Sequence, residues 1–209
     1  MKGIIFIGGE GPSVQLCKSF VSGADLIVAA DSGLIAAENA GIKPDWIIGD
    51  MDSLDDSLRL LSYPPERVLR YPRDKDFTDT EMALWFLRDE GCLSIWIVGG
   101  GGGRIDHLFA IRSLFERENS PERWLTAQED IYCVDGGQEL FLPLPAGSLV
   151  SVFPLGGGPW EAASKGLKWP LNGLAWDRGF FGISNVAVTG SISVQAVRGR
   201  FMVIVPIIR

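Results

Sequence analysis

The first 135 residues alternate short apolar runs with helical patterns, and this alternation constrains the fold more than any other feature of the chain. The apolar runs lack a regular polar alternation, which is typical of strands buried on both faces. Strands and helices alternating at this spacing predict a parallel sheet covered by helices. The expected strands are Gly3–Ile7, Leu26–Ala30, Trp46–Ile48, Arg67–Tyr71 and Ser94–Val98, and the expected helices are Val14–Val21, Leu34–Ala40, Leu58–Leu61, Asp79–Glu90 and Ile105–Glu118.

After Ile131 the pattern changes to short β-type runs broken by Gly and Pro, which favour a small antiparallel sandwich or barrel. Arg198-Gly199 between the last two runs predicts a tight hairpin turn. We therefore expect an α/β domain with a parallel sheet at residues 1–135, followed by a small antiparallel β-sandwich domain at residues 136–209. The expected strands of this second region are Gln138–Leu142, Ser148–Leu155, Val186–Val188, Ser191–Val197 and Phe201–Ile208.

The charge of the chain limits its partners. The net charge is −7, which argues against general binding to nucleic acid or to an anionic membrane surface.

The three cysteines form no C-x-x-C pair, so neither a disulfide framework nor a thiolate zinc site is expected. No apolar run approaches the roughly 18 residues of a membrane-spanning helix, and the first residues lack the core of a signal peptide. These features predict a cytoplasmic protein.

Loops rich in Gly and Asp follow the expected strands of the first region. In an open parallel sheet such loops gather at the carboxyl ends of the strands, where ligands bind. Glycine lets backbone N–H groups approach phosphate oxygens, and aspartates are the oxygen ligands that magnesium prefers. Phosphates and a divalent metal therefore suit this edge. The loops are residues 8–13 (GGEGPS), 31–33 (DSG), 49–53 (GDMDS), 73–79 (RDKDFTD) and 99–107 (GGGGGRIDH).

Each of these loops also has a purely structural interpretation. The pair Asp50 and Asp52 would be unfavourable without a cation, but a turn with a helix-capping aspartate explains the GDMDS segment about as well. Lys75 taken alone is better explained as a solvated partner of Asp74 or Asp76. No G-x-x-x-x-G-K-[ST] motif occurs, so the site is not a P-loop. Thr78 and Glu81 form a T-x-x-E capping box, which predicts a helix start.

Taken together, the motifs resemble the thiamine pyrophosphokinase family. The combination of G-D-x-D-S, K-D-x-T-D and G-G-x-x-G-R-x-D-H is specific, and the matches span most of the chain in the order found in the family. The local sequence around Asp31 departs from the family's usual pattern at Ser32. The matching segments are AADSG at 29–33, GIKPDWIIGDMDSL at 41–54, KDFTDTEMAL at 75–84, GGGGGRIDHLFAI at 99–111, GLKWPL at 166–171 and GISN at 182–185.

The resemblance implies transfer of a pyrophosphoryl group from ATP to the hydroxyl of thiamine, which gives thiamine diphosphate and AMP. It also implies a homodimer with the thiamine site at the subunit interface. The residues implied on the nucleotide side are Asp31, Lys75, Asp76, Thr78, Gly102, Gly103, Arg104 and Asp106, and those on the thiamine side are Asp79, Trp169, Ser184 and Asn185.

The chemistry of these residue types suggests individual roles. We expect Asp50 and Asp52 to bind Mg²⁺ directly. Asp31 would contact either the groups that bind the metal or the nucleotide. Asp79, at a helix N-terminus, would orient the hydroxyl or balance the positive charge of the thiazolium. Arg104 would bind the triphosphate, so Asp50, Asp52, Asp79 and Arg104 form the candidate catalytic set. Trp169 would stack on the cationic ring, although a core tryptophan explains it nearly as well without the resemblance.

Two other functions remain open from the sequence. The same machinery would serve a pyrophosphokinase that acts on another hydroxymethylated heterocycle, such as a pterin. A non-catalytic nucleotide- or thiamine-binding protein of the same fold is the other alternative. The concentration of carboxylates beside an expected polyanion argues against a pure binding protein, because binding alone gives little reason for it.

Overall fold

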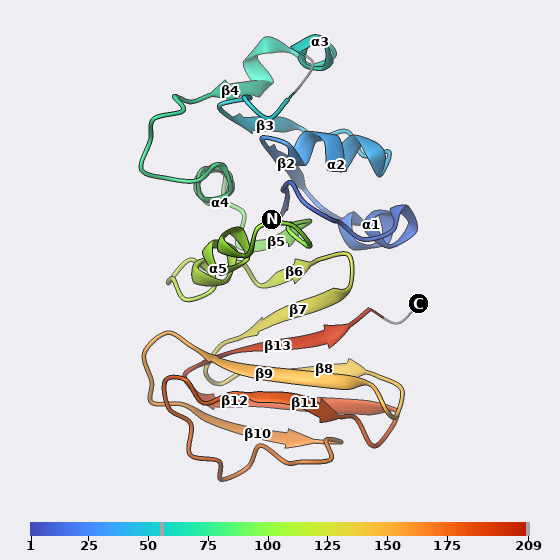
Figure 1. Ribbon diagram of the computed structural model, residues 1–209, viewed down its shortest axis with the longest axis vertical. Helices are drawn as coiled ribbons and strands as arrows, with labels where there is room; N and C mark the ends of the chain where they lie inside the picture. Colours follow the sequence, from blue (N-terminus) through green and yellow to red (C-terminus); the bar gives the residue numbers. More distant parts are fainter. Residues whose placement is uncertain (55–56, 208–209) are drawn as a thin grey trace. The chain divides into compact units, whose positions relative to one another are not determined.

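The computed structural model describes residues 1–54 and 57–207, and the chain divides into two compact units (Figure 1). The first comprises residues 1–114 and 124–127, and the second comprises residues 115–123 and the chain from 128 onward. The boundary expected between residues 135 and 136 separates the two predicted functional domains, and it stays a prediction. Along the chain, the first unit gives way to the second for the first time after residue 114.

The first unit contains a parallel sheet whose strands run in the order β6-β5-β1-β2-β3-β4, with parallel pairing from β5 through β4. Side chains such as Ile4, Ile47 and Ile97 are fully buried, which confirms the expectation of strands covered on both faces. The strands are β1 (Lys2–Phe6), β2 (Leu26–Ala30), β3 (Trp46–Gly49), β4 (Val68–Arg70), β5 (Ser94–Val98) and β6 (Arg123–Leu125).

Helices cover both faces of this sheet. Connections between parallel strands are right-handed, so α1 and α2, which carry the chain from β1 to β3, lie on one face (Figure 1). Helix α4 returns the chain across the sheet to β5, and it therefore lies with α5 on the other face. The helices are α1 (Val14–Val21), α2 (Gly33–Asn39), α3 (Ser57–Leu60), the 3₁₀ turn η1 (Pro65–Arg67), α4 (Asp79–Asp89) and α5 (Ile105–Leu114).

The second unit is an antiparallel sandwich of two sheets, as expected. One sheet has the strand order β11-β9-β13-β7 and the other β10-β12-β8. Val152, Val194 and Phe201 are fully buried in its core. The strands are β7 (Glu129–Val134), β8 (Glu139–Pro143), β9 (Leu149–Leu155), β10 (Glu161–Lys165), β11 (Gly182–Val186), β12 (Ser191–Arg198) and β13 (Arg200–Pro206).

The hairpin predicted at Arg198-Gly199 is wrong. Strand β12 pairs with β10 and β8, whereas β13 pairs with β7 and β9, so Gly199 carries the chain from one sheet to the other. It has φ of 73°, and a Cβ there would lie 2.6 Å from the Trp160 ring. This packing, rather than a two-residue turn, accounts for the glycine.

Other strand bounds also differ from expectation. The segment expected at Val186–Val188 overlaps β11 only at Val186, because β11 runs from Gly182 to Val186. Strand β10 was not expected because its sequence, EAASK, lacks an alternation of β-branched residues. It pairs with β12 at the edge of its sheet. The expected strand Phe201–Ile208 includes Ile208, which lies outside the described residues. Within those residues, no helix is both long and apolar enough to cross a membrane.

Gly33 allows α2 to begin directly against the end of β1. A Cβ at Gly33 would lie 2.0 Å from the carbonyl oxygen of Phe6, and backbone atoms cannot yield as a flexible side chain can. We expect Gly33→Ala to lower the free energy of unfolding by about 3 kcal/mol, measured by urea denaturation. Gly190→Ala is the matched control: nothing lies within 4 Å of its added Cβ, so its stability should change by less than about 0.5 kcal/mol. Equal stability of the two variants would contradict the packing described here.

Candidate active site

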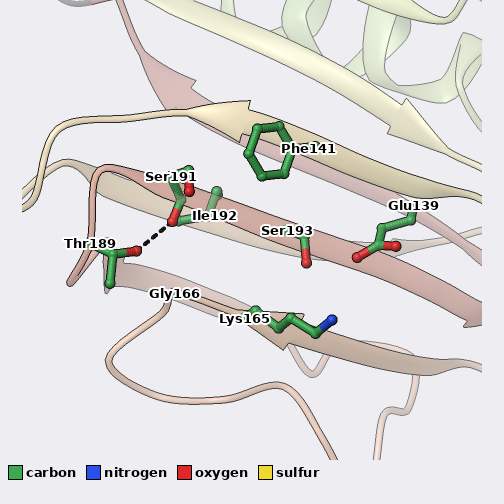
Figure 2. Close-up of a pocket in the computed structure, with 8 residues that line it drawn as sticks. All are labelled: Glu139, Phe141, Lys165, Gly166, Thr189, Ser191, Ile192 and Ser193. Carbon is green, nitrogen blue, oxygen red and sulfur yellow. Dashed lines mark hydrogen bonds between the residues drawn. The ribbon is translucent and has the colours of Figure 1, made fainter.

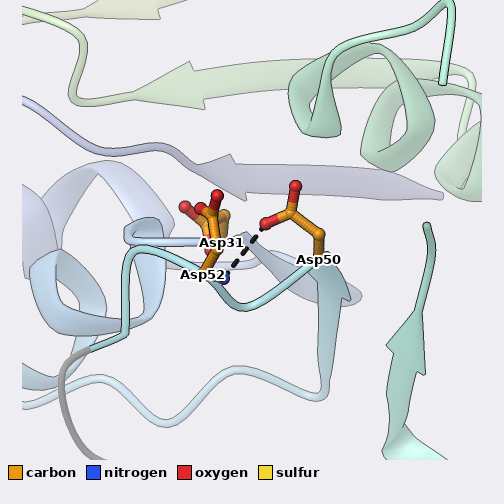
Figure 3. Close-up of side chains that lie close together, drawn as sticks. All are labelled: Asp31, Asp50 and Asp52. Atoms are coloured by element: carbon orange, nitrogen blue, oxygen red, sulfur yellow. Dashed lines mark hydrogen bonds between the residues drawn. The ribbon is translucent and has the colours of Figure 1, made fainter. Parts of the chain in front are cut away.

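Three carboxylates meet at the carboxyl edge of the parallel sheet. Strands β2 and β3 end at Ala30 and Gly49, and Asp31 and Asp50 follow immediately. One carboxylate oxygen from each of Asp31, Asp50 and Asp52 lies within 4.8 Å of the others (Figure 3). The structure thus brings together the aspartates predicted to surround a metal.

The backbone at this cluster is held in unusual conformations. Asp31 has φ of 47° and Met51, between the two other aspartates, has φ of 65°. Residues other than glycine adopt this left-handed region at a cost of about 1–2 kcal/mol, and such strain is concentrated at functional sites. Hydrogen bonds maintain it: Asp31 N–H donates to the Ile48 carbonyl at 2.9 Å, and Asp52 N–H donates to Asp50 Oδ1 at 3.0 Å. The left-handed turn at Met51 places two successive carboxylates on one side of the loop.

Gly49 lets a fourth carboxylate approach. A Cβ at Gly49 would lie 3.1 Å from the Cβ of Asp31 and 3.2 Å from the carboxyl carbon of Asp79. Its φ of 153° also favours glycine. Sequence reasoning did not assign Gly49 a role; a glycine that ends a buried strand just before an aspartate was the available signal.

Asp79 enters the site because α4 begins at this residue. The predicted capping box is confirmed: Glu81 N–H donates to Thr78 Oγ1 at 3.2 Å, and Thr78 N–H donates to Glu81 Oε2 at 2.8 Å. The ammonium of Lys75 lies 3.1 Å from Asp79 Oδ1 and 3.5 Å from Asp50 Oδ2. Lys75 thus contacts two site carboxylates, rather than the Asp74 or Asp76 expected of it in isolation.

The crowding of charges shifts three pKa values. Burial raises the pKa of Asp79, and the negative charges of Asp50 and Asp31 add to this effect against the attraction of Lys75. The hydrogen bond from the Asp52 N–H lowers the pKa of Asp50, and Lys75 lowers it further although burial acts in the opposite direction. Burial disfavours the charged form of Lys75, but its contacts with Asp79 and Asp50 outweigh this and raise its pKa. Asp79 therefore takes a proton more readily than Asp50 does.

Two residues of the loop before α4 lie toward solvent. Arg73, which sequence reasoning did not select, places its Nε 3.0 Å from Asp52 Oδ2. The sequence feature that could have identified Arg73 is its position as a second basic residue in the loop of Lys75. Asp76, predicted on the nucleotide side, is exposed.

The glycine-rich loop after β5 holds the predicted Arg104 and Asp106. Arg104 donates from Nε to Asp106 Oδ1 at 3.1 Å and from Nη2 to Asp106 Oδ2 at 2.5 Å, with both side chains exposed. Its guanidinium is therefore paired with Asp106 and not with the acidic cluster. Gly102 and Gly103 have φ of 63° and 69°, conformations that strongly favour glycine.

Three of the residues predicted for the thiamine side, Trp169, Ser184 and Asn185, lie in the second unit, whereas Asp79 belongs to the first. Asn185, 5% exposed, accepts a hydrogen bond from Trp169 N–H at 3.1 Å and donates one to the Trp169 carbonyl at 2.6 Å. Trp169 as a whole residue remains 53% exposed, so it is not the core tryptophan considered above. Ser184 has φ of 57°, and its N–H donates to Ser151 Oγ at 3.2 Å. Asn185 thus fixes the backbone that presents the indole.

A separate groove of about 390 Å³ lies on the sheet formed by β10, β12 and β8 (Figure 2). Glu139, Phe141, Lys165 and Ser193 are among the residues that line it. Within the described part of the chain, no residue predicted for the thiamine side belongs to its lining, so this groove is not part of the predicted site.

The acidic cluster fits a hard divalent cation. Asp31 Oδ1 is buried and has no hydrogen-bond partner among the described residues, and a buried carboxylate oxygen left in this state is unfavourable unless a cation or donor reaches it. Converging carboxylate oxygens are the donors that Mg²⁺ takes.

The raised pKa of Asp79 predicts how stability depends on pH. A carboxyl whose pKa rises on folding contributes stability that is present below its unfolded pKa of about 3.9 and is lost as pH rises through the folded pKa. At neutral pH without metal we therefore expect Asp79→Asn to melt at a higher temperature than the unmodified protein, with the difference shrinking toward acid. Asp76→Asn, at an exposed position, is the control and should leave the melting temperature unchanged. A lower melting temperature for Asp79→Asn at pH 7 would contradict the assignment.

Comparisons with known proteins agree with this geometry. The family model "Thiamin pyrophosphokinase, catalytic domain" matches residues 17–125, and "Thiamin pyrophosphokinase, vitamin B1 binding domain" matches residues 139–200. The thiamine pyrophosphokinase of Bacillus subtilis strain 168 is 28% identical over 173 residues, which are 80% of each chain.

Solved structures show the same fold. The crystal structure of Bacillus subtilis thiamine pyrophosphokinase gives a TM-score of 0.81 at 23% identity and covers 100% of both chains. That of the Geobacillus thermodenitrificans thiamin pyrophosphokinase gives 0.77 at 27% identity and covers 100% of this chain and 98% of the other. With two family models that together span the acidic cluster and the Trp169–Asn185 pair, this chain belongs to the thiamin pyrophosphokinase family.

Proposed function

We propose that this protein transfers the pyrophosphoryl group of ATP to the hydroxyl of thiamine, releasing AMP and forming thiamine diphosphate. The observation that carries the proposal is the convergence of Asp31, Asp50 and Asp52 at the edge of the sheet, in a chain whose second unit presents an exposed indole. Family membership supports ATP and thiamine as the two substrates.

Asp50 and Asp52 would hold Mg²⁺, with Asp31 beside them. The ion, when bound, would neutralise negative charge on the phosphate oxygens. Lys75 already contacts Asp50 and Asp79, so its ammonium can turn toward a phosphate oxygen that enters between them. The same carboxylates that repel one another in the free protein would then orient the polyphosphate.

In the reaction, the thiamine oxygen forms a bond to the β-phosphorus of ATP. The bond from that phosphorus to the oxygen bridging the α- and β-phosphates breaks, and AMP leaves. Asp79 would orient the hydroxyl and accept its proton; the rise of its pKa on burial supports this role, because it makes the carboxylate a stronger base than an ordinary one. Phosphoryl-type transfer depends mainly on positioning and charge neutralisation, so no stronger base is required.

The remaining predicted residues would position the substrates. On the nucleotide side, Arg104 would exchange its exposed partner Asp106 for a phosphate, which is a small change because exposed ion pairs are weak. Four further residues would position the nucleotide: Gly102 and Gly103 through their backbone, Asp76 through its side chain, and Thr78 at the start of α4. On the thiamine side, Trp169 would stack on the thiazolium while Ser184 and Asn185 hold it in place. A homodimer that completes the thiamine site is part of the proposal.

Loss of either metal-binding carboxylate tests the reaction. We expect Asp50→Asn and Asp52→Asn each to lower kcat by about 100-fold or more, measured by mass-resolved detection of AMP and thiamine diphosphate, while circular dichroism shows an intact fold. Asp74→Asn, an exposed aspartate of a neighbouring loop, serves as the control with unchanged kcat. Full turnover in both variants would remove these residues from the metal site.

The unmodified protein supplies further outcomes of the same assay. Chelation of divalent ions should abolish product formation. AMP formation that does not depend on thiamine would point to another acceptor, such as a hydroxymethylated pterin. Absence of nucleotide turnover would favour a binding protein of the same fold.

The indole of Trp169 should contribute mainly to thiamine binding. A cation stacked on tryptophan in a desolvated site gains about 1–2 kcal/mol, so Trp169→Ala should raise KM for thiamine roughly 5- to 30-fold with KM for ATP unchanged. Trp169→Phe should recover part of the loss. Phe141→Ala removes another exposed aromatic ring of the same unit and should change neither KM. Equal effects on both substrates would contradict the stacking role.

A further inference from the structure

The left-handed turn at Met51 depends on support from outside the acidic loop. Met51 has φ of 65° and lies between Asp50 and Asp52, so its conformation decides where the two carboxylates point. A residue with a side chain enters this region at a cost, and it stays there only where the surrounding structure holds it. The groups that hold Met51 therefore also set how well the loop is formed to bind a cation.

A hydrophobic cluster buries the side chain of Met51, which is 7% exposed. Three members of the cluster belong to β2, β3 and α2 and are completely buried, whereas three others belong to the chain that follows the turn. The first three are Ala29, Ile47 and Leu34, and the other three are Leu54, Leu60 and Tyr63. The packing of Met51 thus depends on keeping the chain after the turn in place.

The segment from 57 to 63 has little means of keeping its own position. Its helix α3 has four residues, and an isolated helix shorter than about 12 residues is marginal in water. Leu58 and Leu61 are 66% and 78% exposed, so one face of the segment has little packing. Contacts with the rest of the unit must therefore hold this segment against the cluster.

Glu38 supplies such contacts with both of its carboxylate oxygens. Arg59 donates from Nη1 to Glu38 Oε2, and the hydroxyl of Tyr63 donates to Glu38 Oε1 at 3.1 Å. The Glu38 side chain is only 25% exposed, and partial burial strengthens such contacts relative to exposed ion pairs. Burial and the charge of Glu38 raise the pKa of Tyr63 to about 12, so the phenol remains a hydrogen-bond donor at neutral pH.

Helix α2, which carries Glu38, is itself fixed near Asp31. The helix begins at Gly33, two residues after Asp31, and Gly33 packs directly against the backbone of Phe6. Glu38 therefore connects the element that follows one aspartate of the cluster to the segment that follows the other two. These contacts join residues 21 and 25 positions apart in the chain.

We propose that Glu38 is a positioning residue for the divalent cation. Through Arg59 and Tyr63 it keeps the segment after the turn packed on Met51, and the turn held in this way keeps the three aspartates of the cluster together. The inference rests on the proposed function only in that the acidic cluster is taken to bind the cation. Glu38, Arg59 and Tyr63 lie outside the residues assigned to ATP, thiamine or the cation itself.

The test measures Mn²⁺ binding by electron paramagnetic resonance, without nucleotide or thiamine. Mn²⁺ takes the same oxygen ligands as Mg²⁺. We expect Glu38→Ala to raise the dissociation constant about tenfold, because a site formed in about a tenth of the molecules binds about ten times more weakly. Glu38→Gln keeps an acceptor for Tyr63 and should lose less. Glu66→Ala removes an equal charge from an exposed position and is the matched control, with a dissociation constant within about twofold of the unmodified protein.

Arg59→Met separates positioning from simple electrostatics. Loss of this positive charge makes the unit more negative and would by itself strengthen cation binding, whereas loss of the contact with Glu38 should weaken it. Methionine retains an apolar stem in place of that of arginine. The double variant of Glu38→Ala with Arg59→Met should bind Mn²⁺ no more weakly than Glu38→Ala alone, because both changes remove one contact. Circular dichroism checks that each variant is folded at the temperature of the measurement.

Steady-state kinetics give a second readout. In Glu38→Ala, the Mg²⁺ concentration that gives half-maximal turnover should rise, while kcat at saturating Mg²⁺ and KM for thiamine stay unchanged. A general loss of stability would not act on the Mg²⁺ dependence alone. Tyr63→Phe, which removes one hydroxyl and no charge, should raise the Mn²⁺ dissociation constant in the same direction and tests the role where Glu38→Ala does not fold.

Three results would overturn the inference. They are unchanged Mn²⁺ affinity in the folded variants of Glu38 and Tyr63, tighter Mn²⁺ binding in Arg59→Met, and failure of the unmodified protein to bind Mn²⁺. If the unmodified protein forms no thiamine diphosphate yet its Mn²⁺ affinity depends on Glu38, the proposed function is wrong and the positioning role is retained. If it forms thiamine diphosphate and its Mn²⁺ affinity does not depend on Glu38, the reverse holds.

Discussion

Mutual repulsion among the carboxylates at the edge of the parallel sheet governs the structure of this site. Like charges held a few ångströms apart are unfavourable, and more so away from bulk water. Strands β2 and β3 each end one residue before an aspartate, and α4 begins at a third. The fold thus assembles an arrangement that its own charges oppose. The ammonium of Lys75, two left-handed backbone conformations and the backbone N–H of Asp52 hold it together.

Burial and hydrogen bonding, more than this repulsion, shift the pKa values of two of these carboxyls in opposite directions. Asp50 is stabilised in its charged form, whereas Asp79, with the larger burial penalty, is pushed toward the protonated form. Neighbouring carboxyls whose pKa values are driven apart can divide the roles of metal ligand and proton acceptor. Strained, charge-crowded sites of this kind reduce stability in the free protein and recover it when ligands bind.

Several parts of this arrangement followed from local sequence. The capping box of Thr78 and Glu81 is confirmed because capping depends on residues three apart in the chain. The apolar runs without polar alternation predicted the buried strands of the first unit correctly, because burial on both faces requires apolar residues at consecutive positions. The hairpin at Gly199 was wrong because a glycine with positive φ serves a sheet-to-sheet crossing as well as a turn. Strand β10 was missed because its sequence carries no strand pattern and its position depends on pairing with β12.

The division between sequence and structure is clearest at the acidic loops. The sequence by itself determined which residue types follow each strand and, through parallel strand order, that they gather at one edge. Tertiary structure alone decided that Asp79 reaches this edge past Gly49 and that Lys75 contacts Asp50. The physical reason is distance along the chain. Backbone propensities act over a few residues, whereas these two contacts join residues from separate elements and depend on how those elements pack.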